Sequence, residues 1–117
     1  MDVWFSQTRR VAAIRPAGPV GPDEADRLRL ALLRATPALL TVVDLAEVTV
    51  LDSTAVAVLV AGAMRAKACR RQVLVANAHG RPLQVITMIG ATDLLAGPLE
   101  LPFTDVLDPS VDAELTP

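Results

Sequence analysis

The stretch that decides the fold reads Val42-Val43-Asp44-Leu45-Ala46-Glu47-Val48-Thr49-Val50-Leu51-Asp52-Ser53-Thr54. It begins within an almost continuous apolar run, residues 39–45, which is typical of a strand buried on both faces. A short connection leads to a second extended piece, residues 48–51. The polar residues 52–54 then open a segment, residues 55–70, that is apolar nearly all round in its first three turns and basic at its end. We expect that segment to be a helix lying against a sheet and covered on other sides too.

Upstream, the pattern predicts a hairpin followed by a break and a helix. Residues 4–7 and 11–15 are strand candidates joined by a turn at residues 8–10. The Pro- and Gly-rich residues 16–22 are expected to interrupt regular structure. Pro22, Asp23 and Glu24 favour a helix start, because proline suits the first helical position and acids complement the positive end of the helix dipole. Thr36-Pro37 is expected to end this helix, whose apolar stripe is Ala25, Leu28, Leu32 and Leu33.

Downstream, another strand and another helix are expected. Residues 72–77 form the strand, residues 77–80 a loop and residues 81–89 the helix, with Gly90 as its stop. The remaining predictions are a turn at residues 93–95, a strand-like piece at 99–101 and a short helix begun by Asp108-Pro109.

Strands separated by helical segments of about 10–15 residues indicate an α/β fold. We expect a mixed, largely parallel central sheet of four to five strands, with an N-terminal hairpin and with helices packed against the sheet. Residues 1–117 contain no internal repeat and no linker, so we expect a single domain.

The composition argues against nucleic-acid binding and against insertion into a membrane. Aromatic residues make up 3% of the chain and the formal net charge is −2, so neither stacking platforms nor a basic stripe supports nucleic-acid binding. The first residues lack the pattern of a secretory signal, and no apolar run approaches the ~18–20 residues that a membrane span needs. We expect a cytoplasmic protein without membrane insertion.

No combination of residues predicts catalysis, a metal site or a cofactor. His79 is the single histidine and has no Ser–His–Asp or multi-ligand spacing around it, so it is expected to be structural or solvent-facing. Cys69 is the single cysteine, which excludes an intramolecular disulfide and a thiolate cluster. Asp44 and Asp52 are not paired by spacing on one helix face, so a two-carboxylate mechanism has no support. We therefore expect no enzymatic activity.

The residues Asp52-Ser53-Thr54 leave two interpretations open. All three residue types are good helix N-caps, so the simpler interpretation is a cap and nothing more. The second gives the Ser53 hydroxyl a function: a phosphate placed there would lie at a helix N-terminus, where N–H groups and the dipole favour an anion. It would add about −1.5 to −2 charges to an apolar surface and repel a docked partner.

The run of residues 42–54, the strand at 72–77 and the later Ile86-Thr87-Met88-Ile89-Gly90-Ala91-Thr92-Asp93-Leu94-Leu95 resemble the STAS family. The chain is most similar to bacterial anti-sigma factor antagonists, over roughly residues 3 to 107. The resemblance implies that the serine directly after the motif aspartate, Ser53, is phosphorylated by an anti-sigma factor kinase of the GHKL type, with Thr54 as a possible alternative. The resemblance further implies that the unphosphorylated form binds that kinase and that a phosphatase, of the PP2C type, resets the cycle.

By the same resemblance, the expected partner-binding residues are Asp52, Ser53, Thr54, Ala55, Val56 and Asp23. Two departures accompany them. Many members have a Ser-Gly-Leu-Gly pattern where this chain has alanine at positions 55 and 57, and an acidic turn where it has residues 18–21. Asp23 lies just beyond that turn and could substitute for the missing acid.

A second function remains open beside the antagonist. A STAS adaptor would bind an ATPase partner constitutively, for example in a lipid-transport ABC complex. The Ser53 hydroxyl would then be a hydrogen-bonding group of the interface and not a phosphoacceptor.

Overall fold

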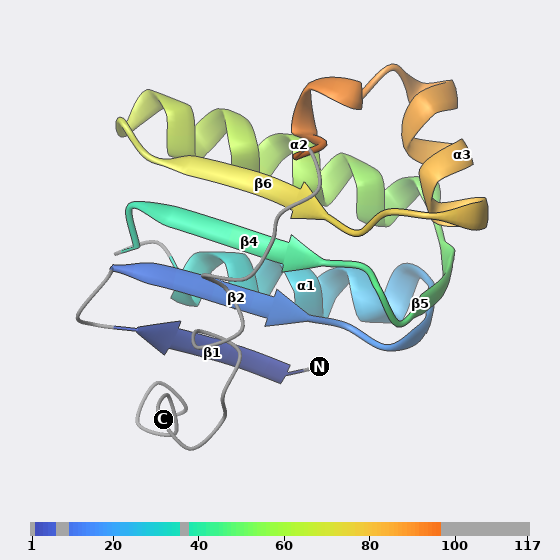
Figure 1. Cartoon of the computed structure of the whole chain (residues 1–117), viewed down its shortest axis with the longest axis horizontal. Coiled ribbons are helices and arrows are strands. Elements are labelled where there is room, and N and C mark those ends of the chain that lie inside the picture. The colour runs from blue at the N-terminus through green and yellow to red at the C-terminus, as the bar shows by residue number, and fades with distance from the viewer. Residues whose placement is uncertain (1, 7–9, 36–37, 97–117) are drawn as a thin grey trace.

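The computed structural model describes residues 2–6, 10–35 and 38–96 (Figure 1). The strands are β1 (Asp2–Ser6), β2 (Val11–Arg15), β3 (Gly18–Val20), β4 (Leu40–Asp44), β5 (Val48–Leu51) and β6 (Gln72–Ala76). The helices are α1 (Pro22–Arg34), α2 (Ser53–Ala68) and α3 (Gly80–Ile89), followed by the 3-10 turn η1 (Thr92–Leu94). Most expected elements are confirmed within a few residues. The predictions for residues 8–9, 36–37, 99–101 and 108 onward lie outside the described residues.

The main sheet has four strands in the order β1-β2-β4-β6. β1 and β2 form an antiparallel hairpin, whereas the β2–β4 and β4–β6 pairs are parallel. Val43, at the centre, is aligned with Ile14 on one side and with Val75 on the other. The expected mixed, largely parallel sheet with a leading hairpin is confirmed.

The expected break at residues 16–22 is wrong in part, because β3 lies inside it. β3 pairs in parallel with β5 as a separate two-stranded sheet. Gly18 has a φ of +74°, which glycine tolerates without a steric cost, and its N–H donates to the Glu47 carbonyl at 2.8 Å. Pro19 cannot donate a ladder hydrogen bond, and the register shifts between Gly18 and Pro19. A strand this short and irregular gives little pattern in the sequence.

Helices α1 and α2 lie side by side on one face of the main sheet, behind it in Figure 1, while α3 packs against β5 and α2. The buried stripe of α1 includes Ala25, Leu28 and Leu32, as expected, but Leu33 is 40% exposed. Gly62 of α2 faces Leu32, whose Cδ1 would lie 3.0 Å from an added Cβ, so the absent side chain allows the two helices to approach closely. In the described part of the chain, none of the helices has the length and apolar character to span a membrane.

Candidate functional site

The mouth of α2, which we define as residues 52–54, is held by a cap and by a backbone pair. Asp52 is the N-cap residue, and its carboxylate accepts a hydrogen bond from the Thr54 N–H at 3.2 Å. The Asp52 N–H donates to the Val20 carbonyl at 2.9 Å, which extends the β3–β5 pairing up to the helix. α2 therefore begins at Ser53, two residues earlier than the sequence suggested, because the cap adds the first turn.

Hydrogen bonding also sets the charge at the mouth. The Thr54 side chain is the largest cause that lowers the pKa of Asp52 below its ordinary value of 3.8, and the Thr54 N–H lowers it further. Partial desolvation acts in the opposite direction but does not cancel these effects. Asp52 is consequently an anion at neutral pH.

Ser53 and Thr54 differ in how their hydroxyls are used. Both residues are exposed. The Thr54 side chain is engaged with the Asp52 carboxylate, whereas the Ser53 hydroxyl has no hydrogen bond to any described residue. Ser53 is thus the residue of the mouth that offers a free hydroxyl to an incoming group.

The structure separates the six residues expected to bind a partner. Asp52, Ser53 and Thr54 are together at the mouth, and Asp23 is exposed in the first turn of α1, the helix that follows β3. Ala55 and Val56 are both 0% exposed and belong to the core. Their role as contact residues stays a prediction, and in the described conformation their side chains face inward.

A second feature of the site is a buried carboxylate whose structural role the sequence analysis did not predict. Asp44, at the end of β4, is 5% exposed and accepts hydrogen bonds from the Ala46 N–H at 2.9 Å and from Asn77 Nδ2 at 3.0 Å. Arg15 Nε lies 3.5 Å from its other oxygen. These contacts fix the turn that leads β4 into β5 and so into α2. An acid directly after a buried apolar strand is the signal that could have revealed it.

His79 joins this turn from the other side. His79 lies at the start of α3, and its Nε2 is 2.9 Å from the Ala46 carbonyl. The expectation that His79 is structural or solvent-facing fits this contact. The described residues contain no group of three or more histidine, cysteine or acidic side chains that could hold a metal ion.

The mouth lies outside the two best-formed cavities of the described residues. These cavities, of about 750 and 70 Å³, are lined in part by the later turns of α2 and include none of residues 52–56. A flat, exposed site of this kind suits a protein surface better than a small substrate.

The family model described as "Mlab, STAS domain" matches residues 4–96 of the chain. The chain belongs to the STAS domain family. No match to this STAS domain was found among curated proteins.

Solved structures agree with the fold. The anti-sigma factor antagonist SpoIIAA in its unphosphorylated form matches with a TM-score of 0.74 at 15% identity, over 87% of this chain and 91% of that one. The Bacillus cell fate determinant SpoIIAA in the phosphorylated form matches with a TM-score of 0.68 at 15% identity, over 90% and 97%. A sulfate transporter family protein from Wolinella succinogenes matches with a TM-score of 0.63 at 19% identity, over 74% and 72%. At these identities the likeness establishes the fold alone.

Proposed function

We propose that this STAS domain is a protein-binding switch of the anti-sigma factor antagonist type and not an enzyme. With Ser53 unphosphorylated it binds an anti-sigma factor kinase of the GHKL type, and a phosphate on Ser53 releases that partner. The free, exposed Ser53 hydroxyl at the first position of α2 carries the proposal. The fold it shares with SpoIIAA, a protein solved with and without phosphate, is consistent with it.

The mouth supplies the physical basis of such a switch. Asp52 already contributes one negative charge there, since its pKa is lowered. A phosphate on Ser53 would make the local charge more negative, from −1 to about −2.5 to −3. It would compete with Asp52 for the N–H groups of the first turn and set two anions side by side, so an apolar or acidic partner surface would be repelled without any change of fold.

The surface around the mouth is suited to a protein partner. Val50 of β5 is 42% exposed and aligned with Pro19 of β3, which is also exposed. Val50 lies two residues before Asp52, and Pro19 lies four residues before Asp23. We propose that Asp52, Ser53 and Thr54 form the contact surface together with this apolar pair and with Asp23.

The test is phosphate transfer recorded by intact mass. The chain is incubated with its candidate kinase and Mg-ATP, beside Ser53→Ala and Thr54→Ala variants. One added phosphate is expected on the wild type and on Thr54→Ala, and none on Ser53→Ala. Phosphate that persists on Ser53→Ala would reject Ser53 as the acceptor.

Binding provides an independent measurement. Ser53→Asp is expected to weaken kinase binding by at least about tenfold, or ~1.4 kcal/mol. Ser53→Asn has nearly the same shape without the charge and is expected to bind much more tightly than Ser53→Asp. Equal affinities for the two variants would show that the switch is not electrostatic.

A second candidate is a constitutive adaptor that binds an ATPase partner, such as that of a lipid-transport ABC complex, without phosphorylation. It is favoured by the alanines at positions 55 and 57, which stand where other members have a glycine-containing pattern. In this case the complex forms, no phosphate is added, and Ser53→Ala weakens binding only by the loss of one hydrogen bond.

A further inference from the structure

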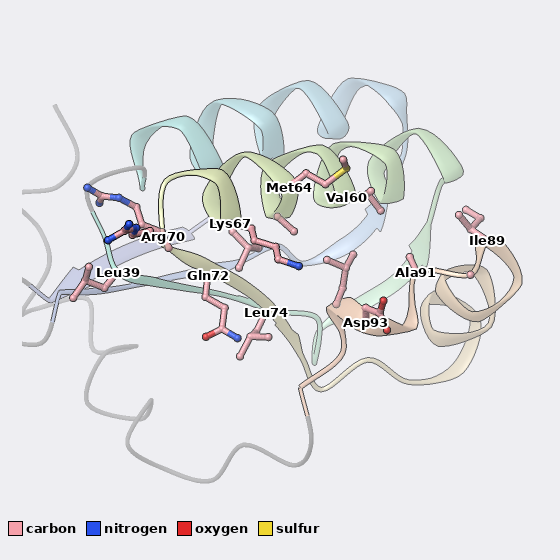
Figure 2. Close-up of a pocket in the computed structure, with 15 residues that line it drawn as sticks. Leu39, Val60, Met64, Lys67, Arg70, Gln72, Leu74, Ile89, Ala91 and Asp93 are labelled. Atoms are coloured by element: carbon pink, nitrogen blue, oxygen red, sulfur yellow. The ribbon is translucent and has the colours of Figure 1, made fainter.

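A groove at the opposite end of α2 from the mouth contains an edge of the main sheet (Figure 2). The groove has a volume of about 750 Å³ and is bounded by the later turns of α2, by β6 and by the segment from Ile89 to Leu94. Among the strands that the structure describes, β6 is paired on one side only, with β4. Residues 72–74 of β6 line the groove, so its first half borders this hollow without a second partner strand.

The residues of β6 direct their backbone groups alternately toward β4 and away from it. The Gln72 N–H donates to the Leu39 carbonyl at 3.0 Å, and the Ala76 carbonyl accepts from the Leu45 N–H at 2.9 Å. Both even-numbered residues therefore face β4. Since successive residues of a strand direct their N–H and C=O groups to opposite sides, the odd-numbered residues of β6 face outward.

Val73 carries the open part of this edge. The outward carbonyl of Val75 accepts a hydrogen bond from the Ala96 N–H at 2.9 Å. By contrast, no described residue forms a hydrogen bond with the outward N–H or carbonyl of Val73. A strand laid along β6 in either direction can accept from this N–H and donate to this carbonyl. Unpaired groups on an edge strand are a template for such pairing.

Apolar side chains border the open edge. The Val73 side chain belongs to the hydrophobic core, so a partner residue beside it would direct its own side chain to the α2 face of the sheet. Met64 of α2 and Ile89 line the groove and are 68% and 48% exposed. Large apolar side chains that are gathered and exposed in this way indicate a surface that binds another segment.

The charged side chains of the groove are mostly cationic. Lys67, Arg70 and Arg71 line it near the end of α2, against a single acid among the described lining residues, Asp93. Arg71 Nη1 donates to the Ala38 carbonyl at 3.3 Å. The side chains of Lys67 and Arg70 form no ion pair or hydrogen bond with any described residue. In Figure 2 the Lys67 side chain reaches over the hollow between α2 and β6, where it would meet an acidic group.

Two other kinds of occupant match the groove less well. An anionic lipid would meet the cations, but its hydrocarbon tail cannot hydrogen-bond to the Val73 backbone. A second copy of the chain would bring the same excess of cations to the edge. An extended peptide with apolar and acidic side chains matches the backbone, the apolar surface and the charge together.

We propose that the edge of β6 at Val73 takes an extended segment of a partner protein as an added strand. The segment pairs its backbone with Val73, places apolar side chains against Met64 and Ile89, and places an acidic side chain beside Lys67 and Arg70. This surface is separate from the mouth, because the groove and the mouth share no residue.

Hydrogen exchange of the full-length chain tests whether the edge is open. The Val73 N–H faces outward, whereas the Leu74 N–H faces β4. The Val73 amide is therefore expected to exchange several-fold faster than the Leu74 amide. Equal protection of the two amides would show that the edge is already occupied, by the chain itself or by a second copy, and would overturn the proposal.

Two synthetic peptides supply the added strand. Their sequences are Thr-Glu-Thr-Val-Thr-Leu-Thr and the reverse, so that the acid reaches Lys67 in either strand direction. At least one is expected to slow exchange at Val73 several-fold and to shift the Met64 methyl resonance, while the methyl of Met88, which lies outside the groove, stays unchanged. The same peptides with Lys in place of Glu are expected to bind several-fold more weakly.

The opposite result would be no slowing at Val73 with either acidic peptide. That result would overturn the proposal, and a shift of the Met64 methyl by dodecyl phosphate in the same experiment would assign the groove to an anionic lipid.

Charge reversal tests the role of the two cations. Lys67→Glu with Arg70→Glu is expected to reverse the preference, so that the Lys peptides bind more tightly than the Glu peptides. The matched control, Arg27→Glu with Arg34→Glu, makes the same change of net charge at exposed positions of α1 and is expected to keep the original preference. The same preference in both double variants would overturn the proposal.

Discussion

The two ends of α2 have opposite chemistry. At its N-terminus lie an anionic cap, a free and exposed hydroxyl and a backbone pair to β3. At its C-terminus, Lys67 and Arg70 border an apolar groove. The helix has 16 residues and is about 24 Å long, which exceeds the ~8 Å Debye length at physiological salt. Charge added at one end is therefore screened at the other, so the two surfaces can bind different partners independently.

A cavity in the core beneath the middle of α2 is expected to destabilise the whole domain, and with it the surfaces at both ends of the helix. Leu59 is 0% exposed, midway along α2. Leu59→Ala is expected to lower the free energy of unfolding by about 2–5 kcal/mol, through lost burial and the cavity left behind. Urea unfolding measures this, with Leu30→Ala as the matched control, because Leu30 is 50% exposed. A similar loss for both variants would contradict the described core.

A substitution of Asn77 is expected to lower local stability near the mouth of α2 and to leave the other end of the helix unchanged. Asn77→Ala removes the amide that donates to the buried Asp44 and leaves a non-glycine residue at a φ of 59°. We expect a loss of about 1–3 kcal/mol, with faster amide exchange in β5 and unchanged exchange in the last turn of α2. Asn77→Gly retains the backbone freedom and should show the effect of the hydrogen bond alone. Uniformly faster exchange throughout α2 would argue against separate ends.

Gly62 tests how tightly the middle of α2 is fixed against α1. Gly62→Ala gains about 1 kcal/mol of helix propensity, but the new Cβ lies 3.0 Å from Leu32 Cδ1, which must move. The two effects oppose each other, so we expect a net change within about 1 kcal/mol by urea unfolding. Gly62→Val should be clearly more destabilising. Equal stability of the two variants would indicate looser packing than the structure has.

The smallest expected effect is the pH dependence of the cap. The pKa of Asp52 is lowered in the folded state. The ionised carboxylate therefore contributes fully to the free energy of unfolding above the ordinary pKa of 3.8, and this contribution is lost as the pH falls through the lowered pKa. Asp52→Asn keeps a good cap without a titrating group. The stability difference between wild type and this variant should therefore shrink on acidification below about pH 4. A difference that is constant with pH would show that the carboxylate does not contribute as an anion.

The parts of the fold that follow periodic patterns could be predicted from the sequence. The strand ending at Asp44 and the helix after Asp52 were both identified, because apolar runs and cap residues are local signals. β3 was missed because its only support is its pairing with β5, almost thirty residues later. The burial of Ala55 and Val56 could not be predicted, because α2 is apolar nearly all round and such a helix does not reveal which side faces the core. The Asp44–Asn77 hydrogen bond and the groove depend on residues brought together only by folding.

The pairing of β3 with β5 also bears on the order of folding. The hydrogen bond between Asp52 and Val20 closes a loop that contains all of α1 and β4. Contacts of such sequence separation form late, since the entropy of loop closure must be overcome before the contact contributes. A nascent chain would display the Ser53 hydroxyl in a disordered peptide first and in the capped helix only afterwards. A kinase that recognises the assembled mouth would therefore act on the finished domain and ignore the chain during its synthesis.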